Sequence, residues 1–104
     1  MGLLKSVILI TNGIYDLICG SNLIFGFSDK LKHLHIDLFD NPNEELISFM
    51  LIIFGLMRLS LNSIYAFISY ILEAIILYHY GKKFNIKVIA TIAFSLILAI
   101  FTII

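Results

Sequence analysis

The chain has 104 residues, of which 61% are hydrophobic and 13% are charged, with seven basic residues against seven acidic ones. Ordinary soluble domains are about 45–50% apolar and about 25% charged, so this composition excludes a typical soluble fold and indicates a lipid bilayer as the surrounding medium. The sequence has no basic stripe that would predict a nucleic-acid partner. Its single cysteine, Cys19, excludes an internal disulfide and a cysteine-based metal site.

Four apolar segments are candidates for membrane-spanning helices, because about 20 apolar residues are needed to cross a bilayer core of about 30 Å. The first covers residues 3–27 and the last covers residues 84–104. Residues 45–80 as one helix would be about 54 Å long, which is too long for one crossing. The polar sequence RLSLNS at 58–63 divides this segment, and the second and third spans are therefore expected at 45–60 and 63–80. The sequence thus predicts one all-α membrane domain over residues 1–104, a four-transmembrane-helix bundle.

The connection between the first two spans contains a predicted amphipathic helix over residues 29–40. On a helix, three leucines and Phe39 share one face, and the charged side chains share the other. This pattern is typical of a short helix that lies in the membrane interface. Ser28 or Asp29 is expected to cap its start. Pro42 stops it, and the next helix is expected to begin with Asn41 as its N-cap and Pro42 at the first helical position.

Lysine and arginine are distributed unevenly between the two sides of the predicted bundle. Lys5 and Arg58 lie on the side of the termini, and the other side carries Lys30, Lys32, Lys82, Lys83 and Lys87. The positive-inside rule therefore predicts both termini outside and the two longer loops in the cytoplasm. In the second of these loops, residues 80–85, Gly81 is expected to end the third span as a C-cap.

The first span carries a polar stripe in the sequence NGIYDLICGSN. At about 100° per residue, the stripe covers roughly one third of the helix circumference and leaves the rest apolar. Its members are Asn12, Tyr15, Asp16, Cys19, Asn22 and Gly26. The stripe is expected to face protein while the other faces meet lipid. Gly13 and Gly20 lie beside it and would let a second helix approach closely.

The third span has a similar polar face, made of Asn62, Tyr65, Ala66, Ser69, Glu73 and Tyr80, with Tyr70 at its margin. Two such faces can be buried only against each other or against a partner. Asp16 and Glu73 lie near the middle of their spans, where an unpaired charge costs at least about 2.5–3.5 kcal/mol. Both carboxyl groups are therefore expected to have partners.

Arg58 is the candidate counter-charge for these two carboxyl groups. Its side chain leans towards the N-terminus of its helix, and therefore into the membrane and towards Asp16 and Glu73. Two interpretations remain open: an ion triad of Arg58 with both carboxylates, or extension of Arg58 into the lipid headgroups. The predicted polar cavity consists of Asn12, Tyr15, Asp16, Asn22, Arg58, Tyr65, Ser69 and Glu73.

Residues associated with catalysis or metal binding are not arranged in a known pattern. In HLHID, His33 and His35 point about 160° apart on a helix, and only His33 with Asp37 is compatible with an i, i+4 pair. The sequence has no HExxH motif, glycine-rich phosphate loop or GxSxG motif. We therefore expect no enzymatic activity, no catalytic residue, no metal site and no cofactor.

Two families of small four-helix membrane proteins resemble this chain. LICGSNLIFGF, the short interfacial segment that follows it and FGLMRL at 54–59 resemble DoxX-like proteins over most of the chain. Similar length and one acidic residue in the first helix, Asp16, resemble the architecture of the small multidrug resistance family, although that family uses glutamate there and has a tryptophan that this chain lacks. The second resemblance implies a homodimer.

The amino-acid usage is also biased. Isoleucine, leucine, phenylalanine, asparagine and lysine are frequent, and tryptophan is absent. This bias is typical of AT-rich genomes, including those of some large DNA viruses, parasites and symbionts.

Three functions are compatible with these features. The favoured one is a non-enzymatic membrane protein whose polar cavity binds a small molecule, an ion or a lipid. The second is a small proton-coupled transporter in which Asp16 or Glu73 titrates. The third is an accessory subunit whose polar stripe docks a helix of another membrane protein.

Overall fold

The computed structural model describes residues 2–104, and this part of the chain contains five α-helices and no β-strand. The helices are α1 (Leu3–Phe25), α2 (Asp29–Ile36), α3 (Glu44–Leu59), α4 (Ser63–Tyr80) and α5 (Ile86–Ile103). The predicted all-α class is thus confirmed. The amphipathic and apolar patterns of the sequence account for these helices, since each buries one face and exposes apolar side chains on the other.

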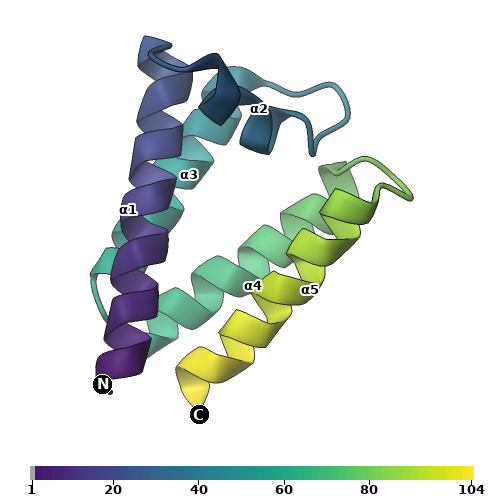
Figure 1. The fold of residues 1–104 in the computed structure, drawn as a ribbon. Coiled ribbons are helices and arrows are strands. Elements are labelled where there is room, and N and C mark those ends of the chain that lie inside the picture. The colour runs from purple at the N-terminus through teal and green to yellow at the C-terminus, as the bar shows by residue number, and fades with distance from the viewer. Residues whose placement is uncertain (1) are drawn as a thin grey trace.

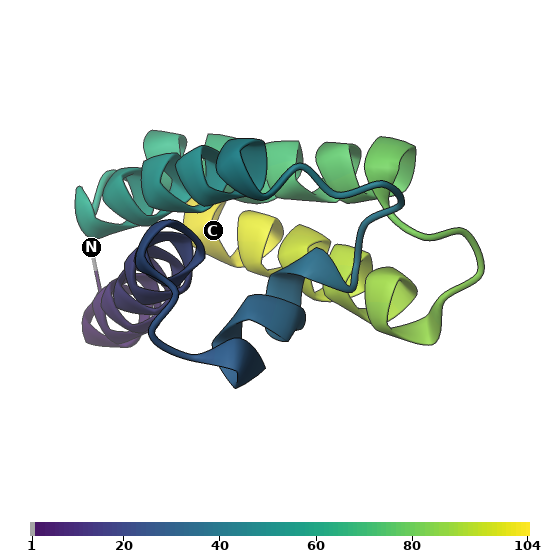
Figure 2. The same ribbon diagram turned by 90° about the horizontal axis from the view of Figure 1, so that it is seen from above.

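The long helices form two antiparallel pairs (Figure 1). α1 packs against α3, and α4 packs against α5. The two pairs meet at the end that holds both termini and the turn between α3 and α4, and they diverge towards the opposite end, where α2 lies between them (Figure 1). Seen from above, α2 and its flanking loops cover this open end (Figure 2). We call these pairs hairpin A (α1 and α3) and hairpin B (α4 and α5).

Among the helices of residues 2–104, three (α1, α4 and α5) are long and apolar enough by themselves to cross a membrane, rather than the four that were predicted. α3 has 16 residues, which corresponds to about 24 Å of helix. It begins at Glu44 because the side chain of Asn43 accepts the backbone N–H of Leu46 at 3.1 Å. The prediction of Asn41 as this N-cap was wrong. Asn41 has a φ of 49°, outside the extended conformation that an N-cap adopts.

The predicted helix over 29–40 is also shorter than expected, since α2 ends at Ile36. The following backbone turns away to pair with the loop between α4 and α5. The N–H of Asp40 donates to the carbonyl of Tyr80 at 3.1 Å, and the N–H of Lys82 donates to the carbonyl of Leu38 at 2.8 Å. These two bonds satisfy backbone groups that a longer α2 would have used internally, and they tie the two hairpins together at their open end.

Most other helix ends follow the predicted capping. Ser28 caps α2, Asn62 caps α4, and the N–H of Gly81 donates to the carbonyl of Leu77 at the end of α4. α4 has the bounds predicted for the third span. α1 stops two residues before the predicted end, because Gly26 adopts a left-handed conformation with φ 69° and its N–H donates to the Asn22 carbonyl.

Glycine allows α1 and α3 to pack closely. A Cβ atom added to Gly13 would lie 3.0 Å from the carbonyl oxygen of Gly55, and one added to Gly20 would lie 3.0 Å from that of Ser48. Each distance is shorter than an ordinary contact, so the prediction that Gly13 and Gly20 receive another helix is confirmed. The Ser48 hydroxyl also donates to the carbonyl of Gly20 at 3.0 Å, which adds a polar contact to this interface.

Candidate functional site

Arg58 joins three helices through its guanidinium group. Nη1 pairs with Oδ2 of Asp16 on α1, and Nη2 lies 2.6 Å from Oε2 of Glu73 on α4. Nε donates to the hydroxyl of Ser69 at 3.0 Å, and that hydroxyl donates in turn to the carbonyl of Ala66. We call Asp16, Arg58 and Glu73 the ion triad. Hydrogen bonds between charged partners are about twice as strong as neutral ones, and the planar guanidinium group can serve both carboxylates at once.

Aromatic rings complete the surroundings of Arg58. The guanidinium carbon lies 4.0 Å from the ring centre of Tyr70 and 5.5 Å from that of Phe54. Arg58 is only 2% exposed, and its side chain points into the protein rather than to the end of α3. The sequence left open whether Arg58 forms an ion triad or extends into the lipid headgroups, and the structure contains the ion triad.

Further polar contacts continue from the triad along α1. Nδ2 of Asn12 donates to the hydroxyl of Tyr70 at 3.0 Å, so the ring that covers Arg58 is held from the neighbouring hairpin. Tyr15, one turn further on, lies with its ring centre 5.6 Å from that of His35 on α2. The polar stripe of α1 thus contacts α2 as well as α3 and α4, which carry the other two residues of the triad.

These groups line a cavity of about 190 Å³ between the hairpins. All five helices contribute to it. Its lining consists of Asn12, Tyr15, Asp16, Leu34, His35, Leu38, Arg58, Tyr70, Glu73, Thr91, Phe94, Ser95 and Leu98. We call this space the triad cavity. Pockets for drug-sized ligands are about 300–1,000 Å³, so this one suits a ligand of only a few heavy atoms.

Three of the predicted cavity residues lie elsewhere. Asn22 is 1% exposed, and its side chain bonds both the N–H and the carbonyl of Ser28, at 2.7 and 2.8 Å. It therefore organises the turn between α1 and α2. Tyr65 is 52% exposed and faces outward from α4. Ser69 supports Arg58 from behind and does not line the cavity.

Several lining residues had no place in the predicted site. Tyr70 had been assigned to the margin of the polar face of residues 63–80, and His35 had been considered as a metal ligand. Thr91 and Ser95 of α5 are spaced i, i+4 and share a helix face, which is the only sequence signal that could have identified them. α5 is otherwise largely apolar, so its sequence does not single out its small polar side chains as site residues.

The histidines of α2 have different surroundings. Nδ1 of His33 lies 3.1 Å from Oδ1 of Asp37, and both side chains are exposed. Nδ1 of His35 is buried and has no hydrogen-bond partner. Burial lowers the pKa of His35, with Glu73 acting to raise it and Arg58 to lower it. His35 is therefore neutral at pH 7.

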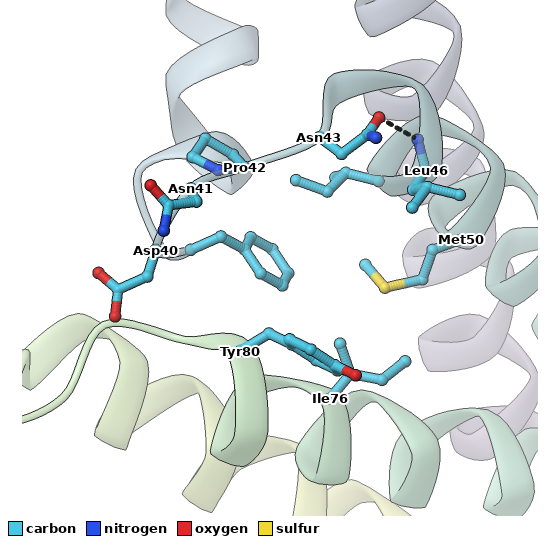
Figure 3. Close-up of a pocket in the computed structure, with 10 residues that line it drawn as sticks. Asp40, Asn41, Pro42, Asn43, Leu46, Met50, Ile76 and Tyr80 are labelled. Atoms are coloured by element: carbon cyan, nitrogen blue, oxygen red, sulfur yellow. Dashed lines mark hydrogen bonds between the residues drawn. The ribbon is translucent and has the colours of Figure 1, made fainter.

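A larger hollow of about 420 Å³ lies between the α2–α3 connection and the facing ends of α3 and α4. Leu46 and Met50 approach it from α3, Ile76 and Tyr80 from α4, and the connection around Pro42 closes one side (Figure 3). Its lining is mostly apolar, and its one acidic residue, Asp40, is exposed. Charged and hydrogen-bonding groups converge instead on the smaller triad cavity, which is therefore the candidate functional site.

Comparisons with protein-family models, curated protein sequences and solved structures found no match to this chain. The candidate site consequently rests on its geometry.

Proposed function

We propose that this chain is a multi-pass integral membrane protein whose triad cavity binds a small polar ligand. The observation that carries the proposal is the ion triad at the wall of a cavity between two helical hairpins. Burying two charged partners costs several kcal/mol per ion before their attraction offsets it, and well-packed apolar residues are often as stable. A charged cavity of this kind suggests a ligand that uses the charges.

The proposed topology has four crossings, with α3 inside the membrane beside α1. α3 packs along α1, so a bilayer around α1 also surrounds α3. Both termini lie at the same end of the molecule (Figure 1), which requires an even number of crossings. Local thinning of the bilayer or extension of flanking side chains accommodates a helix about 6 Å shorter than a core of about 30 Å, at a modest cost.

We further propose that the end with the two long loops faces the cytoplasm and that α2 lies in the interface. The five lysines of the loops and of the start of α5 lie at that end, whereas Arg58, counted on the opposite side, is engaged in the ion triad. Single cysteines at positions 61 and 83, in a Cys19→Ala background, test this arrangement. A membrane-impermeant thiol reagent added to intact cells should label position 61 and not position 83, and the reverse pattern would overturn the orientation.

Ligand binding can be tested with purified protein in detergent. A panel of small polar solutes would be screened by thermal shift, and native mass spectrometry would detect molecules that co-purify. Thr91→Leu adds apolar bulk at the cavity wall and should abolish any shift, while the lipid-facing control Ile97→Phe should retain it. A shift of equal size in the Thr91→Leu protein, or no shift with any solute in the unmodified protein, would overturn the proposal.

A further inference from the structure

The triad cavity contains more acidic than basic groups. Two carboxylates, Asp16 and Glu73, share one guanidinium group. Among the cavity-lining residues only His35 could add a second positive charge, and its burial keeps it neutral at pH 7. With both carboxyl groups ionised the cavity therefore carries one net negative charge. A charge enclosed by protein and lipid favours a compensating cation much more strongly than the same charge in water does.

The ion triad leaves carboxylate acceptors of the cavity unused. Arg58 occupies Oδ2 of Asp16 and Oε2 of Glu73, and the second oxygen of each carboxylate accepts no hydrogen bond from the described residues. The hydroxyl groups of Thr91 and Ser95 lie on the same lining and can accept further hydrogen bonds. An alkylammonium group has three N–H donors and no acceptor. The number and type of these atoms thus match that group.

The same residues are poorly arranged for a metal ion. The described part of the chain contains no group of three histidine, cysteine, aspartate or glutamate side chains close enough to hold one. The volume of about 190 Å³ corresponds to about six water molecules at about 30 Å³ each. It is larger than a bare ion needs and sufficient for a short alkyl chain, which Leu34, Phe94 and Leu98 would contact.

We propose that the triad cavity binds a small primary ammonium compound, with the ammonium group between the carboxylates of Asp16 and Glu73 and the alkyl part against α5. This inference rests on the proposed ligand-binding function and names its ligand class. Quaternary ammonium ions are expected to bind less well, because they have no N–H donor.

The purified protein is titrated with n-propylammonium chloride at pH 7.5, and isothermal titration calorimetry measures the affinity. Propionamide serves as the neutral probe of similar size, and tetramethylammonium as the cation without donors. Propylammonium should bind at least tenfold more tightly than either. Glu73→Gln removes the surplus charge while leaving the Arg58–Asp16 pair, so this variant should fold and lose at least tenfold in affinity. Asp37→Asn, which removes an exposed carboxylate outside the cavity, should bind as the unmodified protein does.

The possible outcomes separate the two proposals. Binding of propionamide as tight as that of propylammonium would overturn the ammonium assignment and leave a ligand-binding cavity. Unchanged propylammonium affinity in the Glu73→Gln protein would also overturn the assignment, because the charge of Glu73 would then not contribute to binding. Absence of binding by every probe, together with no shift in the wider solute panel, would overturn both proposals.

Discussion

Nη2 of Arg58 lies 2.6 Å from Oε2 of Glu73, and this contact joins α3 of hairpin A to α4 of hairpin B. The same guanidinium group binds Asp16 of α1. Arg58 therefore belongs to both the packing within hairpin A and the junction between the hairpins. α3 and α4 are linked by a short turn but diverge beyond it (Figure 1), so the triad is the main polar connection across the junction.

Removal of Arg58 should destabilise the protein strongly. In the Arg58→Ala protein, the buried carboxylate of Asp16 and the partly buried one of Glu73 lose their counter-charge, and breaking a buried pair in this way costs about 3–5 kcal/mol. Combining it with Asp16→Asn and Glu73→Gln should recover part of this loss, because the neutral amides need no cation. Unfolding by SDS in mixed micelles measures the free energy of unfolding of the Arg58→Ala protein, of the double amide protein and of the protein that combines all three substitutions. Strictly additive effects of Arg58→Ala and the double amide would contradict the coupling.

Close packing of α1 on α3 should make Gly55 intolerant of larger residues. A Cβ atom at this position would lie 2.8 Å from the carbonyl oxygen of Gly13, which is backbone and cannot turn aside. Gly55→Ala should therefore separate the two helices and cost about 1–3 kcal/mol, as overpacking typically does. Gly2→Ala is the matched control, since a Cβ atom there has nothing within 4 Å. Equal stability of the two variants in the same unfolding assay would show that α1 and α3 are less closely packed than described.

Asn22 and Asn12 should have separable roles. Asn22→Ala leaves the backbone N–H of Ser28 without its partner, while the Ser28 carbonyl keeps the N–H of Lys32. It should cost about 1–3 kcal/mol, the usual penalty for an unsatisfied buried group. Its effect on ligand affinity should be small, because Asn22 does not line the cavity. Asn12→Ala should lower ligand affinity, because Tyr70 over Arg58 loses its hydrogen bond. Paired thermal-shift and calorimetric measurements on both variants check this separation.

His35 should make stability depend on pH. Its pKa in the folded protein lies below the ordinary value, which is about 6.5 in the unfolded chain. Below that value the unfolded chain takes up the proton first, so stability is full above about pH 6.5 and falls as the pH decreases towards the folded pKa. In the His35→Asn protein, the unfolding midpoint should change less with pH between pH 7 and pH 5. Thr91→Ser, a cavity variant that removes no titratable group, should keep the original slope, and identical slopes in all three proteins would contradict the assignment.

Periodicity identified the faces of the helices correctly but left their exact direction open. Asp16, Glu73 and Arg58 were recognised because a charge within an apolar segment requires a partner, and they are brought together as an ion triad. Asn22 and Tyr65 had been placed on the same faces, yet one folds back onto the turn at Ser28 and the other faces outward. A helical face spans about one third of the circumference, and neighbours within it can meet different surroundings.

Composition and spacing alone determined that the chain is helical, that its helices are largely apolar and that the carboxyl groups of Asp16 and Glu73 need partners, because these are properties of single apolar segments. Only the tertiary structure decided where α2 ends. The backbone bonds of Asp40 to Tyr80 and of Lys82 to Leu38, which join segments about 40 residues apart, replace its last turn. The tertiary structure likewise brought Thr91 and Ser95 of an apolar helix to the charged cavity. Contacts between distant segments depend on the angle at which the two hairpins cross, and no local sequence pattern encodes this crossing angle.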